Sequence, residues 1–269
     1  MTALARRLAA LGLAEGARTE RLAGGDLSEV LLIHRRNGAA SVAKASYPAG
    51  VETQMLRAIA DAGVPVPKVE AEYEGLLLME HVPNDGVFSP RAWESIGVAV
   101  RSLHDREGST YGWPVDFQLG TVALDNRQGN DWCHFFGEQR LLATAKVLDR
   151  PWRERIESLC GRMPGLLPAA PPASLLHGDL WSGNILVRDG TLAALIDPAC
   201  YYGHGEVDLA MLSLFSDLPP VFNEAYGPLE PGWEERRAIY QLFPALVHLR
   251  LFGTSYATMV DRLLRAAGV

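Results

Sequence analysis

Three oxygen-bearing side chains in this sequence have the types and spacing that phosphoryl transfer requires. The segment from His177 to Asn184 reads HGDLWSGN, and Asp197 follows thirteen positions after Asn184. Asp179 could orient an attacking hydroxyl and accept its proton, while Asn184 and Asp197 could hold Mg²⁺ ions that bridge nucleotide phosphates. The alternative for each carboxylate is a buried structural ion pair. The joint spacing favours the catalytic interpretation.

A lysine and a glutamate upstream fit the same chemistry. Lys44 ends a short apolar run, and Glu52 opens a segment with helical apolar spacing. In kinase-like folds such a pair orients the lysine toward the α and β phosphates. Taken singly, Lys44 would be an edge-strand surface residue and Glu52 a favourable charge at a helix start. Because Asn184 stands five positions after Asp179, as in protein kinases, we favour the pair.

Two backbone segments could meet the nucleotide. The first is the turn-forming cluster Gly24, Gly25 and Asp26, whose N–H groups could cover phosphates because paired glycines allow close approach. A plain hairpin turn is the alternative. The second segment ends the apolar run that starts at Leu76, and it comprises Glu80, His81 and Val82. Its backbone could meet an adenine edge, although a core strand with an exposed end would look the same.

The overall composition excludes several classes of protein. The 269 residues are 48% hydrophobic and 21% charged, as in ordinary globular proteins. A net charge of −7 argues against nucleic-acid binding, which needs a basic surface. No apolar run is long enough to span a membrane. Three widely spaced cysteines form neither a disulfide framework nor a zinc motif, which favours a cytoplasmic location: Cys133, Cys160 and Cys200.

The hydrophobic pattern predicts an α+β fold with two lobes. Leu4, Leu8 and Leu11 lie at helical spacing in a first amphipathic helix, which we expect to dock on the protein rather than serve as a transit peptide. Alternating segments and turn residues then predict a small antiparallel sheet with one main helix. We therefore expect a nucleotide-binding lobe over residues 1–82 and a larger, mainly helical catalytic and acceptor-binding lobe over residues 83–269.

Within the larger lobe, the pattern predicts how the candidate residues are positioned. Helical spacing covers residues 90–104 and residues 131–142, the second with a wide apolar face. Strands are expected at 174–177 and 185–188, on either side of the loop, and at 192–196. A turn at Asp189-Gly190 would join the last two strands. Asn184 and Asp197 would then lie at the ends of one ribbon, close enough to share a metal ion.

The chain resembles the fructosamine kinase (ketosamine 3-kinase) family, a branch of the aminoglycoside-phosphotransferase and choline-kinase group with a protein-kinase-like fold. Tryptophan after Asp-Leu in the loop is typical of the family, and Gly24 to Asp26 and Lys44 fit its nucleotide loop and lysine. Three further segments match: residues 196–211, residues 131–141, and residues 240–253. Gly205 and residues 214–217 depart from the family pattern near the expected acceptor side.

The resemblance implies transfer of the γ-phosphoryl group of ATP, with Mg²⁺, to the 3-hydroxyl of a ketosamine. We expect the ketosamine to be free or protein-bound, and the enzyme to be a monomer or a homodimer. Trp181 could pack on a sugar ring, and Asp131 and His248 could border the acceptor pocket; core packing is the alternative for each aromatic segment. His177, Glu206 and Asp208 are expected to brace the loop. Other acceptors, such as an aminoglycoside, a choline-like amine or a free sugar, and a non-catalytic ATP-binding protein remain alternative hypotheses.

Overall fold

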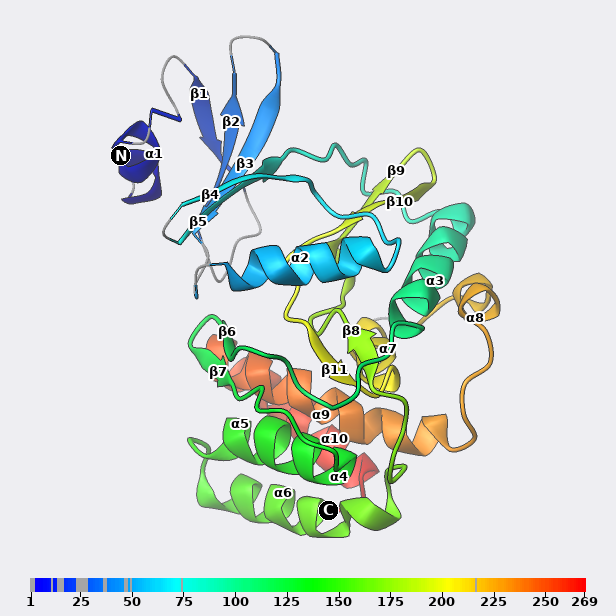
Figure 1. Cartoon of the computed structure of the whole chain (residues 1–269). Helices are drawn as coiled ribbons and strands as arrows, with labels where there is room; N and C mark the ends of the chain where they lie inside the picture. Colours follow the sequence, from blue (N-terminus) through cyan, green and yellow to red (C-terminus); the bar gives the residue numbers. More distant parts are fainter. Residues whose placement is uncertain are drawn as a thin grey trace.

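A sheet-based lobe and a mainly helical lobe divide the molecule, as the computed structural model in Figure 1 shows. The structure describes residues 3–10, 12–13, 17–22, 29–35, 38–45, 48, 50–73, 75–215 and 217–269. The smaller lobe, at the top of Figure 1, holds the N-terminal part of the chain, and the C-terminus lies in the larger one. The predicted α+β fold with two lobes is confirmed.

The smaller lobe is built on a five-stranded antiparallel sheet in the order β1-β2-β3-β5-β4. Its strands are β1 (Arg18–Arg21), β2 (Val30–His34), β3 (Ala40–Ala45), β4 (Val69–Tyr73) and β5 (Leu76–Glu80). Leu76 and Leu78 of β5 face the helix α1 (Ala3–Ala10), while Leu77 and Met79 face the other side. This alternation explains why the strand reads as a continuous apolar run, since both faces of the sheet are covered.

Two helices cover this sheet, and one of them also joins the lobes. In α1, Leu4 and Leu8 are buried against the sheet, so the expected docked helix is confirmed; Leu11 lies outside the described residues. The helix α2 (Val51–Asp61) turns Leu56 toward the sheet and packs Met55 with the core of the larger lobe. Because α2 contributes to both cores, it sets how the lobes meet.

The larger lobe consists mainly of helices around one core. They are α3 (Pro90–His104), α4 (Trp132–His134), a π-helical segment (Phe135–Leu142), α5 (Ala143–Ala145), α6 (Arg150–Arg162), α7 (Glu206–Leu212), α8 (Pro220–Tyr226), α9 (Trp233–Phe252) and α10 (Ala257–Ala266). The expected helices at 90–104 and 131–142 are present. The second is wound as a π-helix for most of its length.

Three short antiparallel ribbons complete the larger lobe, together with 3₁₀ turns at Met163–Gly165, Ser182–Asn184 and Thr254–Tyr256. The ribbons pair β6 (Phe117–Leu119) with β7 (Val122–Leu124), β8 (Ser174–Leu176) with β11 (Tyr201–Gly203), and β9 (Ile185–Arg188) with β10 (Thr191–Leu195). Asp189 and Gly190 have φ angles of 52° and 73°, so they form the predicted turn between β9 and β10. The strands before and after the candidate loop belong to different ribbons, β8 and β9.

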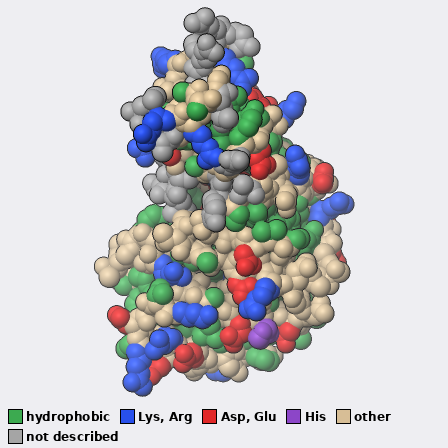
Figure 2. All heavy atoms as spheres, turned by 60° about the vertical axis from the view of Figure 1, so that its left-hand side comes forward, with side chains coloured by type: hydrophobic (Ala, Val, Ile, Leu, Met, Phe, Trp, Pro, Cys, Tyr) green, Lys and Arg blue, Asp and Glu red, His purple; other side chains and the backbone are tan. Residues whose placement is uncertain are grey.

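Two surface expectations bear on possible partners. The face drawn in Figure 2 mixes basic and acidic side chains and has no continuous basic patch. None of the helices in the described part of the chain is long and apolar enough to cross a membrane.

Candidate active site

The loop between β8 and β9 brings two of the predicted residues into direct contact. The side-chain amide of Asn184 donates to the backbone oxygen of Asp179 at 2.8 Å and to its Oδ2 at 3.0 Å. The N–H of Ile196, at the end of the neighbouring strand β10, donates to the Asn184 carbonyl at 3.0 Å. The ribbon therefore holds Asn184 beside the start of the Asp197 segment, as the spacing predicted.

Asp197 lies across the lobe boundary from Lys44. Its Oδ1 is 2.7 Å from the Lys44 Nζ, which is also 2.9 Å from the Glu52 Oε1, so the predicted pair of Lys44 and Glu52 is present. Burial alone would lower the pKa of Lys44, but the two carboxylates outweigh it and raise that pKa. Asp197 has a φ of 56°, unusual for a residue other than glycine, which marks a backbone held in place by its surroundings.

The carboxyl group of Asp179 has a raised pKa. Burial raises the pKa of this carboxyl to about 7, the hydrogen bond from Asn184 opposes the rise, and the negative charges of Asp197 and Asp208 add to it. The positive charge of Lys44 acts in the opposite direction. A base whose pKa is near neutral is ionised often enough to accept a proton and basic enough to hold it.

One carboxylate on α7 fixes the start of this loop. Asp208 is buried and accepts from the N–H of His177 at 2.7 Å and the N–H of Gly178 at 2.9 Å, and its Oδ2 is 3.2 Å from His104 Nε2. Gly178 has a φ of 80°, and a Cβ there would lie 2.0 Å from the Ala199 carbonyl oxygen. Glycine is therefore required where the loop passes the Asp197 segment.

His177 braces the loop, as expected from its place beside the candidate base. Its Nε2 donates to the Ile196 carbonyl at 3.0 Å, and its Nδ1 accepts from the N–H of Asp179 at 3.4 Å. Burial lowers the pKa of His177, which keeps the ring neutral with one donor and one acceptor nitrogen. One nitrogen is thus used within the loop, and the other ties the loop to the residue before Asp197.

The three residues predicted for the acceptor side differ in their surroundings. Trp181 is 38% exposed, and its indole lies close to Gly183. A Cβ on residue 183 would lie 2.3 Å from the nearest indole carbon. Asp131 caps α4 by accepting from the N–H of His134 at 2.9 Å. His248 donates to the Pro244 carbonyl at 2.8 Å. Among the described residues, neither Asp131 nor His248 forms a hydrogen bond or ion pair with Asp179, so their predicted role rests on the sequence.

The segments predicted to meet the nucleotide are only partly described. Gly24, Gly25 and Asp26 lie outside the described residues. At the end of β5, the Glu80 side chain accepts from the N–H of Lys68 at 2.9 Å, and the N–H of His81 donates to the Ala40 carbonyl at 3.2 Å. The next N–H, that of Val82, has no backbone partner in the described part of the chain. The contact of this segment with an adenine edge stays a prediction.

A second group of possible metal ligands lies at the start of α7, but the guanidinium of Arg236 already occupies it. Ligand atoms of His204, Glu206 and Glu230 lie within 4.8 Å of one another. The Arg236 Nε donates to Glu206 at 2.7 Å, and its NH2 group also reaches Glu206 and the Glu230 carbonyl. Glu206 is therefore the structural brace that the sequence suggested.

The whole chain superposes on a solved structure, which defines the class of protein. A candidate fructosamine-3-kinase of Thermobifida fusca matches with a TM-score of 0.85 and 29% identity, over 99% of this chain and 98% of the other. This shared architecture is protein-kinase-like. The fold and the site thus define a kinase of the protein-kinase-like fold, which uses ATP to phosphorylate a hydroxyl group.

Sequence comparisons identify the family. The model of the fructosamine kinase family matches residues 17–267. A probable ketoamine kinase of Thermus thermophilus is 37% identical over 260 residues, which cover 91% of this chain and 92% of that protein. A chloroplastic protein-ribulosamine 3-kinase of Arabidopsis thaliana is 33% identical over 205 residues, 70% of this chain and 62% of its own length. The chain belongs to the fructosamine kinase family.

Proposed function

We propose that this kinase transfers the γ-phosphoryl group of ATP to a sugar hydroxyl of a ketosamine, a sugar attached to an amine. Family membership supports this assignment, as do relatives named for ketoamines and ribulosamines. The observation that carries the mechanism is the contact of Asp179 with Asn184, beside the ion pair of Lys44 and Asp197.

In this proposal Asp179 is the general base. The acceptor hydroxyl donates to its carboxylate, the hydroxyl oxygen forms a bond to the γ phosphorus, and the bond to the β-phosphate oxygen breaks. The hydroxyl proton goes to Asp179, so the products are ADP and a phosphate monoester. A pKa of about 7 suits Asp179 to this role, because proton transfer is most efficient when the pKa of the base lies near the working pH.

Asn184 and Asp197 form an oxygen donor set that fits Mg²⁺. Hard divalent cations prefer carboxylate and amide oxygens, and the Asp197 carboxylate already attracts a cation, the Lys44 ammonium. Mg²⁺ held there would neutralise charge on the nucleotide phosphates. Lys44, oriented by Glu52, would donate to the phosphate oxygens once its contact with Asp197 is released.

The remaining contacts divide between the two lobes, for which we propose the boundaries 1–82 and 83–269. In the first, Gly24, Gly25 and Asp26 would cover the phosphates, and the backbone of Glu80, His81 and Val82 would meet adenine. In the second, Trp181 would offer its exposed indole to the sugar ring. Asp131 and His248 would border the acceptor pocket.

The test is an ATP-consumption screen over lysines glycated with sugars from trioses to hexoses. An aminoglycoside, choline and the free sugars serve as competing acceptors at the same enzyme and ATP concentrations. We expect phosphate transfer to glycated lysine that depends on Mg²⁺ and is about 10²- to 10⁴-fold slower in Asp179→Asn. Preferential phosphorylation of any competing acceptor would overturn the proposed substrate class while leaving the kinase chemistry in place.

A further inference from the structure

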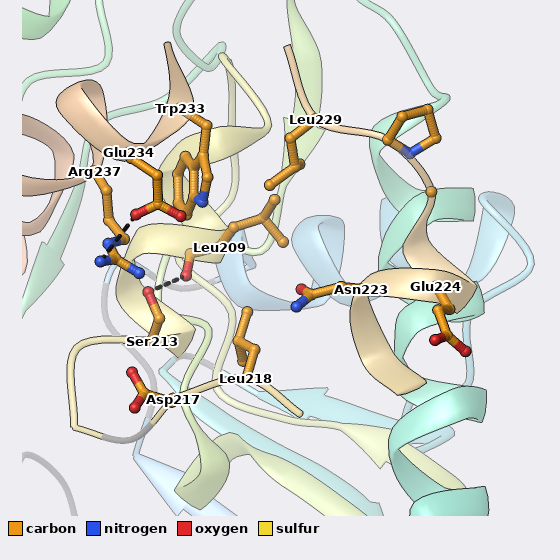
Figure 3. Close-up of a pocket in the computed structure, with 12 residues that line it drawn as sticks. Leu209, Ser213, Asp217, Leu218, Asn223, Glu224, Leu229, Trp233, Glu234 and Arg237 are labelled. Carbon is orange, nitrogen blue, oxygen red and sulfur yellow. Dashed lines mark hydrogen bonds and ion pairs between the residues drawn. The ribbon is translucent and has the colours of Figure 1, made fainter. Parts of the chain in front are cut away.

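A cavity separate from the candidate active site opens on the larger lobe. It has a volume of about 700 Å³ and lies between α7, α8 and the start of α9 (Figure 3). The linker after α8 and the segment before it close two of its sides. The candidate catalytic residues do not line it, so the phosphoryl-transfer site does not account for it.

The middle of this cavity is apolar. Leu209 of α7, Leu218 and Leu229 point toward one another in Figure 3, and Trp233 at the start of α9 lies beside them. The side-chain amide of Asn223 from α8 turns toward the same space. Such a surface suits an aliphatic chain that carries polar groups at its ends.

The edge of the cavity carries negative charge. Asp217 and Glu224 are exposed and lie on opposite sides in Figure 3, and neither forms an ion pair with the part of the chain that the structure describes. The third carboxylate, Glu234, is 3.0 Å from the guanidinium of Arg237, which neutralises it. Two acidic groups are therefore left to attract cations from outside the molecule.

The cavity is close to the candidate catalytic loop through one helix. Leu209 lines the cavity, and its neighbour Asp208 accepts the N–H groups of His177 and Gly178 at the start of the loop. A helix with its side chains is about 10–12 Å wide. The cavity and the start of the catalytic loop therefore both contact α7.

We propose that the cavity docks a lysine- or arginine-rich segment of a polypeptide whose ketosamine is phosphorylated at Asp179. The methylene chains of such residues lie along the three leucines, and their charged groups reach Asp217 and Glu224. The inference rests on the proposed function and extends it, because a single glycated lysine cannot occupy both places. It predicts that a basic polypeptide segment around the ketosamine improves the substrate.

The test compares two substrates in two double variants. The substrates are a glycated lysine monomer and an oligolysine peptide with one glycated residue. Asp217→Asn with Glu224→Gln removes both free charges, and Asp61→Asn with Glu138→Gln removes two exposed charges elsewhere as a matched control. We expect the first double variant to raise KM for the peptide about 3- to 10-fold at low salt, with kcat and the monomer kinetics unchanged. The rise should shrink at high salt.

A second measurement separates docking from catalysis. Unglycated oligolysine should inhibit phosphorylation of the glycated peptide competitively in the wild-type enzyme, and about 3- to 10-fold more weakly in the first double variant. Three results would each overturn the docking site. KM for the peptide could change equally in both double variants, the first double variant could lose activity equally with both substrates, or its inhibition by unglycated oligolysine could equal that of the wild type. A failure of both the glycated monomer and the glycated peptide to react would instead overturn the proposed function.

Discussion

Two pairs of carboxylates in the larger lobe differ in how completely they are satisfied. Asp208 and Glu206, at the start of α7, are buried and occupied: Asp208 holds two backbone N–H groups and His104, and Glu206 holds Arg236 through both oxygens. Asp179 accepts a hydrogen bond from Asn184. The side chain of Asp197 is 39% exposed, and within the described part of the chain its ion-pair partner is Lys44.

This difference distinguishes carboxylates that stabilise the fold from carboxylates that we propose take part in the reaction. A buried carboxylate with its acceptor positions filled fixes the groups around it. A carboxylate with an unused oxygen beside like charges is poorly stabilised as an anion, and burial accordingly raises the pKa of Asp179 to about 7. Burial also raises the pKa of Glu206, but there the hydrogen bonds and charge of Arg236 oppose the rise.

The comparison is tested most strongly by Asp179→Asn. We expect kcat to fall about 10²- to 10⁴-fold, because an amide cannot accept the hydroxyl proton. In the folded wild type the pKa of Asp179 is about 7, against about 3.9 when unfolded, so this carboxyl destabilises the fold progressively as pH rises from about 4 to about 7. Tm of the variant should therefore exceed that of the wild type at pH 8 and match it at pH 4. A lower Tm at pH 8 would contradict the assignment.

Glu206→Gln should show the opposite behaviour. It leaves the Arg236 guanidinium without its charged partner, so we expect a loss of about 3–5 kcal/mol in the free energy of unfolding. Below the unfolding transition, kcat should change by less than about twofold, because Glu206 contacts neither the loop nor the substrate in our proposal. Denaturant titration and initial rates measure the two effects. A large fall in kcat without a loss of stability would place Glu206 in the reaction.

Asp208→Asn should fall between these variants. One oxygen becomes a donor that faces a backbone N–H, so we expect a loss of about 1.5–3 kcal/mol in stability. The loop that carries Asp179 would shift, and kcat should drop about 10- to 100-fold with KM for ATP nearly unchanged. Glu206→Gln serves as the control for stability loss alone. If kcat stays at the wild-type level, the backbone contacts of Asp208 do not set the position of the base.

The comparison also predicts the pH dependence of the wild type. Activity requires ionised Asp179, so kcat/KM for the acceptor should fall about tenfold per pH unit below about pH 7. Rates between pH 5 and 9 with saturating Mg²⁺ and ATP measure this. An acidic limb that persists in Asp179→Asn would belong to another group.

Much of this arrangement was predictable from local spacing. The loop residues Asp179 and Asn184 lie on one short segment, and the ribbon of β9 and β10 with its Asp189-Gly190 turn carries the chain back to Asp197. The pairing of Lys44 with Glu52 likewise follows from a strand and the next helix. Each contact depends on elements that are neighbours in the sequence.

The parts that escaped prediction depend on distant residues. The π-helix at Phe135–Leu142 contains Arg140, whose guanidinium is buried. That guanidinium donates to the Asp125 carbonyl and to Asn126 Oδ1, and it lies over the Tyr201 ring. Apolar spacing alone cannot distinguish this winding from an α-helix. Strand β8 pairs with β11 rather than with β9, which local patterns do not reveal. The cavity beside α7 forms between α7, α8 and the start of α9, and local sequence patterns do not predict that these three segments lie together.

The ion pair of Lys44 with Asp197 has a consequence for nucleotide binding. Each group comes from a different lobe, and each serves as a counterion for the other. If the nucleotide binds as we propose, its phosphates and metal ion take the place of this contact, so the ion pair competes with nucleotide binding.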